Sequence, residues 1–257
     1  MENHRHHDRH HSVTSTNESR SGELAALGFA ICFPSILTFA YFVLFAGHPA
    51  SASVYGIGKV IQFGFPAIWV FLVVREKIPR MTLKVAGKEF YWLRLGAGFG
   101  LAVSGLMIAL AFLWLKPSGF LDGPVIAIQG KIADMNVDSF SAYVVVSVFY
   151  CLCHSLLEEY YWRWFVFKRL QTFVPIPVAI LVSSLGFMAH HVIVLAIFFG
   201  WASPATYLFS LCIAVGGAVW AWMYERSGSI YAPWLSHALV DAGIFLLGYL
   251  LAGELLT

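Results

Sequence analysis

One stretch of the chain places ionisable side chains inside apolar sequence. Between residues 143 and 167 the chain is otherwise apolar, and the exceptions lie close together: His154, Glu158, Glu159 and Arg163. A charge at the centre of a bilayer costs at least ~2.5–3.5 kcal/mol, so acids and bases in such a segment usually face a polar interior and have a function. This stretch is therefore the first candidate for chemistry.

On a helix, the adjacent carboxylates of Glu158 and Glu159 face different neighbours, and this predicts different roles for them. Glu159 precedes Arg163 by four residues, and this order favours an ion pair on a helix. His154 precedes Glu158 by the same interval, on a helix face rotated away from the Glu159 side. The spacing predicts that Arg163 neutralises Glu159 and that Glu158 remains for chemistry.

The composition is that of an integral membrane protein. Of the 257 residues, 59% are hydrophobic and 12% are charged, whereas soluble domains carry about 25% charged residues. The formal net charge of +2 is too small to support a nucleic-acid partner. We therefore expect the lipid bilayer, and no nucleic acid, among the partners.

Runs of about 20 apolar residues predict transmembrane helices. The sequence predicts an all-α polytopic membrane helix bundle of about seven such helices, near residues 24–47, 54–74, 95–115, 139–168, 177–200, 204–225 and 230–252. Residues 120–135 predict a short amphipathic helix on the outer surface.

The distribution of basic residues predicts the orientation of the chain. Six of them lie around the connection between the second and third spans: Arg75, Lys77, Arg80, Lys84, Lys88 and Arg94. The positive-inside rule then gives a cytosolic N-terminus, seven crossings and a C-terminus on the other side. It leaves open the source membrane, either a bacterial inner membrane or the endoplasmic reticulum, and the oligomeric state.

Three regions follow from this pattern. Residues 1–23 are rich in His, Ser and Thr and predict a disordered tail. Residues 24–138 hold the first three transmembrane helices and their loops. Residues 139–252 hold a four-helix core with nearly all the intramembrane ionisable groups.

The ionisable groups lie on the fourth, fifth and seventh spans. They are His154, Glu158, Glu159, Arg163, His190, His191, His237 and Asp241. Hydrogen bonds between helices would explain one or two of them, whereas eight on three helices favour a functional polar cavity. His190 points away from the face of His191, and we expect it to hydrogen-bond a neighbouring helix.

Two kinds of chemistry fit these residues. A cavity lined by Glu158, His191, His237 and Asp241 could bind and deprotonate a water molecule, with a carboxylate as the general base. Alternatively, Glu158, His191 and His237 could ligate zinc and leave one position open for water. The soluble His-Glu-x-x-His zinc motif is absent.

Three motifs give the sequence a specific resemblance. Glu158-Glu159-x-x-x-Arg163, Phe187-x-x-x-His191 and His237-x-x-x-Asp241 occur in this order. Together they resemble the signature of the CPBP family of intramembrane proteases, which includes CAAX-prenyl endopeptidases and bacterial proteins of bacteriocin processing and immunity. The resemblance covers residues 139–245. It implies an intramembrane endopeptidase that needs no cofactor and acts on a membrane-associated peptide or lipidated protein, either prenylated or carrying a leader peptide.

The resemblance also implies a role for each motif residue. Glu158 would be the catalytic carboxylate, and His191 would help it to orient and deprotonate the attacking water. His237, with residue 241, would stabilise the oxyanion. Glu159 and Arg163 would be the supporting pair.

Asp241 departs from the family pattern, in which Asn is commoner. An ionised Asp only accepts hydrogen bonds and would repel a developing oxyanion. Asp241 is therefore protonated, or orients His237, or ligates a metal.

Other classes of function compete with the glutamate-type protease. The zinc-dependent protease would use the same residues as ligands. A bacteriocin-immunity or scaffold protein that kept the fold without catalysis is a second alternative, which Asp241 favours and the retained Glu158, His191 and His237 disfavour. A proton-coupled transporter is disfavoured because the sequence has no evident inverted repeat.

Overall fold

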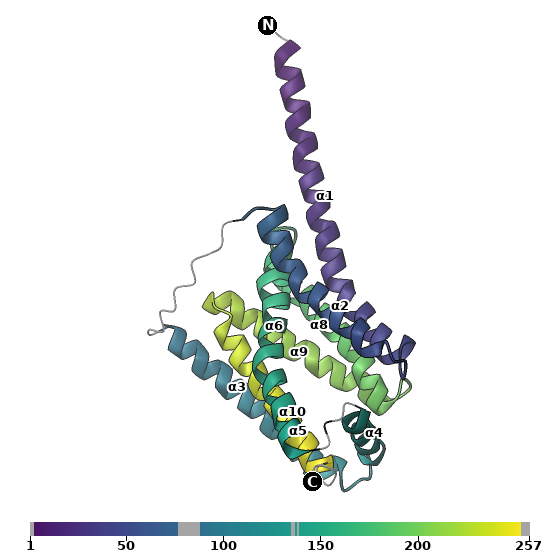
Figure 1. Cartoon of the computed structure of the whole chain (residues 1–257). Helices are drawn as coiled ribbons and strands as arrows, with labels where there is room; N and C mark the ends of the chain where they lie inside the picture. The colour runs from purple at the N-terminus through teal and green to yellow at the C-terminus, as the bar shows by residue number, and fades with distance from the viewer. Residues whose placement is uncertain (1–2, 77–87, 135–136, 138, 253–257) are drawn as a thin grey trace.

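The chain folds into a bundle of helices (Figure 1). The computed structural model describes residues 3–76, 88–134, 137 and 139–252, and all the regular secondary structure in these residues is helical. Seven helical stretches are long and apolar enough to cross a membrane: Arg20–Leu44, Ser51–Val73, Lys88–Leu115, Phe140–Leu170, Ile176–Phe199, Pro204–Ser227 and Tyr231–Ala252. Each overlaps one predicted span, so the predicted all-α membrane bundle is confirmed.

Several spans combine α-helix with wider π-helical turns. The first three are α1 (Asn3–Phe39) with η1 (Ala40–Leu44), α2 (Ser51–Ala67) with η2 (Ile68–Val73), and α3 (Lys88–Leu110) with η3 (Ala111–Leu115). The fourth comprises α5 (Phe140–Val148), η4 (Phe149–His154), α6 (Ser155–Glu159), η5 (Tyr160–Phe167) and α7 (Lys168–Leu170). The last three are α8 (Ile176–Phe199), α9 (Pro204–Ser227) and α10 (Tyr231–Ala252), and α4 (Asp122–Asp134) is a shorter helix before the fourth span.

The N-terminal segment differs from the prediction. Helix α1 begins at Asn3, so it includes most of the residues for which the composition predicted a disordered tail. This part of α1 extends away from the bundle (Figure 1). Adding residues to an existing helix is much easier than nucleating one, and the first span supplies the nucleus.

The connections bear on two further predictions. The short helix expected within residues 120–135 is present as α4, which packs against α8 and α10, whereas Met135 lies outside the described residues. Of the six basic residues used to predict the orientation, Lys77, Arg80 and Lys84 also lie outside them. The cytosolic N-terminus and the outer position of α4 therefore stay predictions.

Short-range signals set the ends of the spans that carry the motifs. The Ser139 hydroxyl accepts a hydrogen bond from the Ala142 N–H at 3.3 Å and caps α5. Ser203 caps α9 in the same way, with Pro204 at the first helical position. Gly228 ends α9 with φ +72°, a left-handed conformation that glycine adopts at little cost.

Small residues bring α3 against α10. A Cβ atom on Gly100 would lie 2.7 Å from the Ser236 carbonyl oxygen, and one on Gly96 would also clash with the backbone of α10. Close by, the Ser104 hydroxyl donates a hydrogen bond to the Leu239 carbonyl at 2.8 Å. Small residues four positions apart allow membrane helices to pack backbone to backbone. The packing fixes α10, which carries the third motif, against a helix outside the motif region.

The core of the bundle surrounds η5. Tyr161, Trp162 and Phe165 are buried there together with Arg163. The Tyr161 hydroxyl donates a hydrogen bond to the Ala30 carbonyl at 2.8 Å, which ties the fourth span to α1. The second half of the fourth span thus lies in the buried core and holds the first motif.

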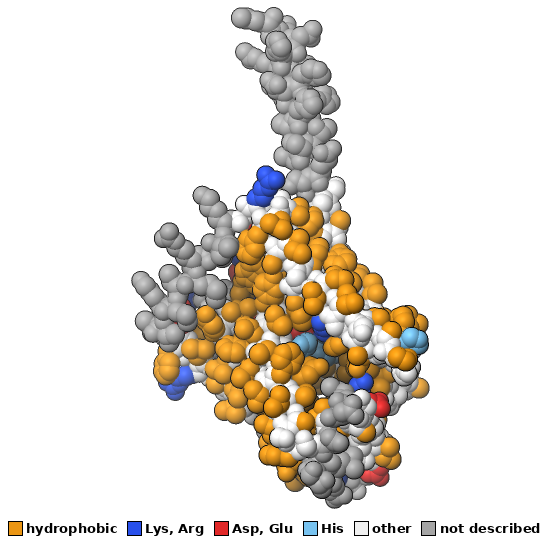
Figure 2. Space-filling view, in the orientation of Figure 1, with side chains coloured by type: hydrophobic (Ala, Val, Ile, Leu, Met, Phe, Trp, Pro, Cys, Tyr) orange, Lys and Arg blue, Asp and Glu red, His pale blue; other side chains and the backbone are white. Residues whose placement is uncertain are grey.

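The face of the described bundle seen in Figure 2 is predominantly hydrophobic. Large apolar side chains point outward along several spans, and Leu113 is 81% exposed. Exposing this much apolar surface to water would cost free energy, whereas exposing it to lipid does not. The surface is therefore suited to a lipid environment. The chain is an integral, multi-pass membrane protein.

Candidate active site

The Glu158 carboxylate lies at the meeting point of three spans. Its Oε1 atom is 3.3 Å from His154 Nε2, one turn earlier in the same span, and 3.6 Å from His190 Nε2 on α8. Its Oε2 atom is 3.8 Å from His237 Nε2 on α10. Glu158 is only 4% exposed. The spans predicted to share a polar centre therefore do so, around this carboxylate.

Glu159 belongs to a fully buried network that shares His237 with Glu158. Its Oε2 atom is 3.1 Å from Arg163 Nε, so the ion pair predicted from the spacing is present. Its Oε1 atom accepts a hydrogen bond from His237 Nδ1 at 2.8 Å. The sequence did not predict this second contact, which joins the first motif to the third.

Helix α9 also supports this network, although it contains no motif residue. Arg163 Nη2 donates a hydrogen bond to the Gly217 carbonyl at 3.3 Å. A Cβ atom on Gly217 would lie 3.3 Å from the Phe187 ring and 3.6 Å from Arg163 Nη2, so a larger residue would crowd the guanidinium. In the sequence, the small residues Gly216 and Gly217 within one span are the signal that allows this close approach.

The His237 ring is held on two sides. Its Nδ1 atom donates to Glu159, and its face stacks on the Trp220 indole with centroids 4.2 Å apart and an interplanar angle of 15°. Trp220 is itself fixed by a hydrogen bond from Nε1 to the Ser236 hydroxyl at 2.9 Å. Because Nδ1 is engaged, Nε2 is the nitrogen that faces Glu158.

Asp241 approaches the same nitrogen of His237. Its Oδ1 atom is 3.7 Å from Nε2, and the Asp241 side chain is 18% exposed. The four-residue spacing of the third motif thus brings these two side chains together on one face of α10. The contact that orients His237 through Nδ1 comes from Glu159, so Asp241 is not needed for that role.

His190 and His191 lie side by side at the edge of the site. Their ring centroids are 4.1 Å apart. The His191 Nδ1 atom is 2.8 Å from the Phe187 carbonyl oxygen; as a donor there, it leaves Nε2 as the free acceptor. His191 thus neighbours His190, whose Nε2 atom faces Glu158. Phe187 packs against the rings of both His191 and His237.

His190 contacts a neighbouring span, where its partner is the candidate catalytic carboxylate. Within the described residues, neither of its ring nitrogens has a hydrogen-bond partner, and Nε2 faces Glu158. Its ring lies parallel to that of Trp162, at 5.9 Å. His154 and His190 therefore both contact the candidate catalytic carboxylate. The four-residue spacing indicated the first of these contacts, whereas no sequence signal indicated the second.

The candidate zinc ligands were Glu158, His191 and His237. In the part of the chain that the structure describes, no group of three or more His, Cys, Asp or Glu side chains is arranged to hold a metal ion. Glu158 and His237 approach each other, while His191 is engaged with the Phe187 carbonyl through Nδ1. The described side chains therefore form contacts between the Glu158 carboxylate and the histidines around it.

The fold and the site together define a multi-pass membrane protein with a buried acid–histidine centre. Residues 140–243 match the family model described as "Type II CAAX prenyl endopeptidase Rce1-like". The match relates this segment, which contains all three motifs, to the CPBP family of CAAX proteases, and this family indicates a protease. The chain has no significant match among curated proteins or among solved structures.

Proposed function

We propose that the chain is a glutamate-type intramembrane endopeptidase, which hydrolyses a peptide bond of a membrane-associated substrate by attack of water. One observation carries the proposal: both oxygens of the buried Glu158 carboxylate face histidines, and these histidines come from three spans. The family match of the same segment supports this assignment. The proposed substrate is a peptide that is prenylated or carries a leader sequence.

Glu158 is the proposed general base. It takes a proton from a water molecule that then attacks the scissile carbonyl carbon, and it returns this proton to the leaving amine. A positioned base of this kind contributes about 10²–10⁴-fold to the rate. His154 and His190 hold the carboxylate in place, and His191 offers its free nitrogen to the attacking water.

His237 is the proposed oxyanion donor. To donate from Nε2 while Nδ1 donates to Glu159, the ring must carry both protons. Glu159 accepts one of these hydrogen bonds and Arg163 compensates the charge of Glu159, so the second N–H can point at the developing negative charge. Asp241 lies beside this nitrogen. It can donate a hydrogen bond to the oxyanion only when its carboxyl group is protonated.

Cleavage and its metal dependence test the proposal together. Purified full-length protein is incubated in detergent with a farnesylated peptide and with the same peptide without lipid, and the products are identified by mass spectrometry. We expect hydrolysis of an internal peptide bond that persists after strong chelation. Loss of activity on chelation and its return with zinc would instead support the metalloprotease.

The same preparation distinguishes the scaffold alternative. If alanine at Glu158, His191 and His237 left the protein's biological effect intact, and the wild-type protein cleaved neither peptide, catalysis would not be its function. If the alanine variant lost both the effect and the cleavage of either peptide, the protease would be supported.

A further inference from the structure

A cavity of about 200 Å³ lies at one end of the bundle, where α3 and α10 begin and α9 ends. It is smaller than the ~300–1,000 Å³ pockets that enclose drug-sized ligands, so it fits a group of a few heavy atoms. Because three membrane spans end here, the cavity lies at the level where hydrocarbon gives way to lipid headgroups. Trp92 and Trp222 pack together at this level, with ring centroids 5.3 Å apart, as aromatic residues do at membrane interfaces.

The residues that line the cavity repeat one spacing on two helices. They are Glu89, Trp92 and Leu93 on α3, and Tyr231, Trp234 and Leu235 on α10. Residues with this spacing share one face of a helix. The two helices run parallel, since Gly96 meets Ala232 and Gly100 meets Ser236. Both faces therefore begin at the same end of the bundle and meet at the cavity.

The aromatic walls are held in place by contacts within the protein. Trp234 Nε1 donates a hydrogen bond to the Leu152 carbonyl at 3.0 Å, which ties this ring to the fourth span. The Tyr231 and Trp234 rings lie at an interplanar angle of 62°, with centroids 6.5 Å apart. The Tyr231 N–H donates to the Ser229 hydroxyl at 3.3 Å, which fixes the turn before α10. Aromatic faces that are already positioned bind a cation at little ordering cost.

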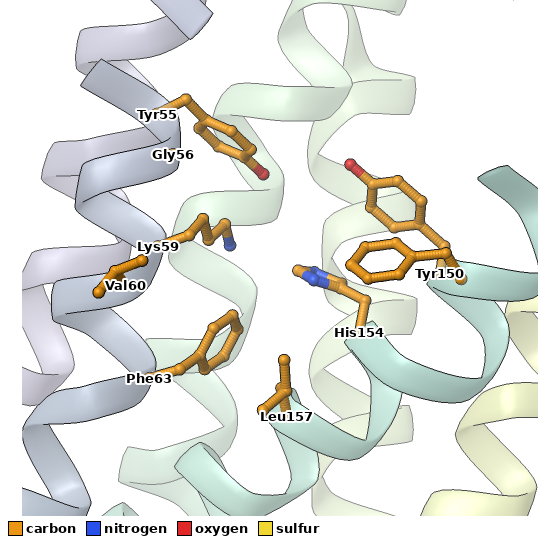
Figure 3. A pocket seen from close by; sticks show the side chains of 9 residues that line it. Tyr55, Gly56, Lys59, Val60, Phe63, Tyr150, His154 and Leu157 are labelled. Carbon is orange, nitrogen blue, oxygen red and sulfur yellow. The ribbon is translucent and has the colours of Figure 1, made fainter. Parts of the chain in front are cut away.

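The charge of the lining favours a cation. Glu89 is its acid, and the described residues that line the cavity include no Lys, Arg or His. Among the described residues, no basic nitrogen lies within 4.0 Å of the Glu89 carboxylate. A larger cavity between α2 and the fourth span has the opposite character, because Lys59 points across it toward His154 (Figure 3). A carboxylate beside aromatic faces suits an ammonium group, including a quaternary one.

Exposed basic residues lie next to this acid-lined cavity. Lys88 and Arg226 are exposed, and each is adjacent in sequence to a lining residue, Glu89 and Ser227 respectively. An acid in the cavity with bases beside it complements a zwitterionic headgroup, in which a short linker joins an ammonium group to a phosphate. The apolar surface of the spans below would contact the acyl chains. A phospholipid supplies all three parts.

We propose that this cavity binds the ammonium group of a zwitterionic phospholipid, phosphatidylethanolamine or phosphatidylcholine, and that Lys88 and Arg226 contact its phosphate. The inference is independent of the proposed function. A headgroup in the cavity contacts α3, α9 and α10 together. It therefore holds the start of the helix that carries His237 against its two neighbours.

Binding is tested with full-length protein that has been stripped of lipid in detergent. Phosphatidylethanolamine, phosphatidylcholine and phosphatidylglycerol with identical acyl chains are added in turn. Native mass spectrometry counts the bound lipid, and thermal unfolding reports the stabilisation. We expect the two zwitterionic lipids to bind about 10-fold more tightly than phosphatidylglycerol and to raise the unfolding temperature further. This comparison uses the wild-type protein, so it needs no variant to fold.

Substitutions at Glu89 test the assigned contact. Glu89→Gln should remove the preference for zwitterionic lipid, and Glu89→Lys should reverse it in favour of phosphatidylglycerol. Tyr231→Leu removes one aromatic face and should reduce the preference. Asp122→Asn is the matched control, because it removes one exposed acid beyond the other end of the third span. It should leave the preference intact.

Several results would overturn the inference. Equal binding of the three lipids, or a preference that survives Glu89→Gln, would mean that the acyl chains are recognised and the ammonium group is not. Equal stabilisation by free phosphoethanolamine and by phosphatidylethanolamine would assign the cavity to a soluble ligand. None of these results bears on the proposed function, which fails separately if Glu158→Gln retains full activity.

Discussion

Replacing Glu158 with Gln is expected to abolish peptide hydrolysis while the protein stays folded. The amide cannot accept a proton from water, so the rate should fall by about 10²–10⁴-fold or more, the contribution of a general base. The change is nearly isosteric, and Gln can still contact His154 and His190. Cleavage of the farnesylated peptide by purified protein gives the rate, and thermal unfolding in detergent reports the fold.

A second glutamate provides the matched control. Glu225 accepts a hydrogen bond from Gln171 at 2.6 Å, at the end of α9, away from the acid–histidine centre. Glu225→Gln makes the same chemical change there and should leave the rate unchanged. Full activity of Glu158→Gln, or an equal loss in both variants, would contradict the role assigned to Glu158.

The largest loss of stability is expected at Glu159. Glu159→Leu leaves the Arg163 guanidinium buried without its carboxylate, and breaking a buried ion pair in this way costs about 3–5 kcal/mol. The unfolding temperature should fall sharply. Thermal unfolding followed by tryptophan fluorescence measures this loss.

A double variant separates the stability of the network from its function. Glu159→Leu combined with Arg163→Met replaces the pair with apolar side chains, which is often neutral for stability. We expect the unfolding temperature to recover but hydrolysis to stay low by about 10²–10³-fold, because His237 has lost the acceptor for Nδ1 and its donor is no longer aimed. Wild-type activity in the double variant would show that Glu159 does not position His237.

The spans and the short-range contacts could be predicted from the sequence. Apolar runs of membrane length predicted all seven helices. The third helix begins at Lys88 and not near residue 95, so it also includes the less apolar residues Tyr91, Trp92 and Arg94. The four-residue spacing predicted that Glu159 meets Arg163 and that His237 meets Asp241. Both kinds of prediction rest on geometry within one helix.

Contacts between distant helices could not be predicted in the same way. The Glu159–His237 hydrogen bond and the approach of His190 to Glu158 depend on how each helix is rotated about its axis. In soluble helices an apolar stripe fixes this rotation, but membrane spans are apolar all round. Lys59 was likewise visible in the sequence, yet only the packing of α2 against the fourth span places it opposite His154.

The origin of the oxygen atom added to the product tests the central claim most directly. Metal-free protein in detergent and 18O-labelled water is mixed with less than one equivalent of substrate peptide. The product of this single turnover is analysed by mass spectrometry. If Glu158 activates water, the new carboxyl group carries one solvent oxygen from the first turnover onward. If the first-turnover product contains no solvent oxygen, then an oxygen of the protein attacked the carbonyl, and the account of Glu158 as a base on water is contradicted.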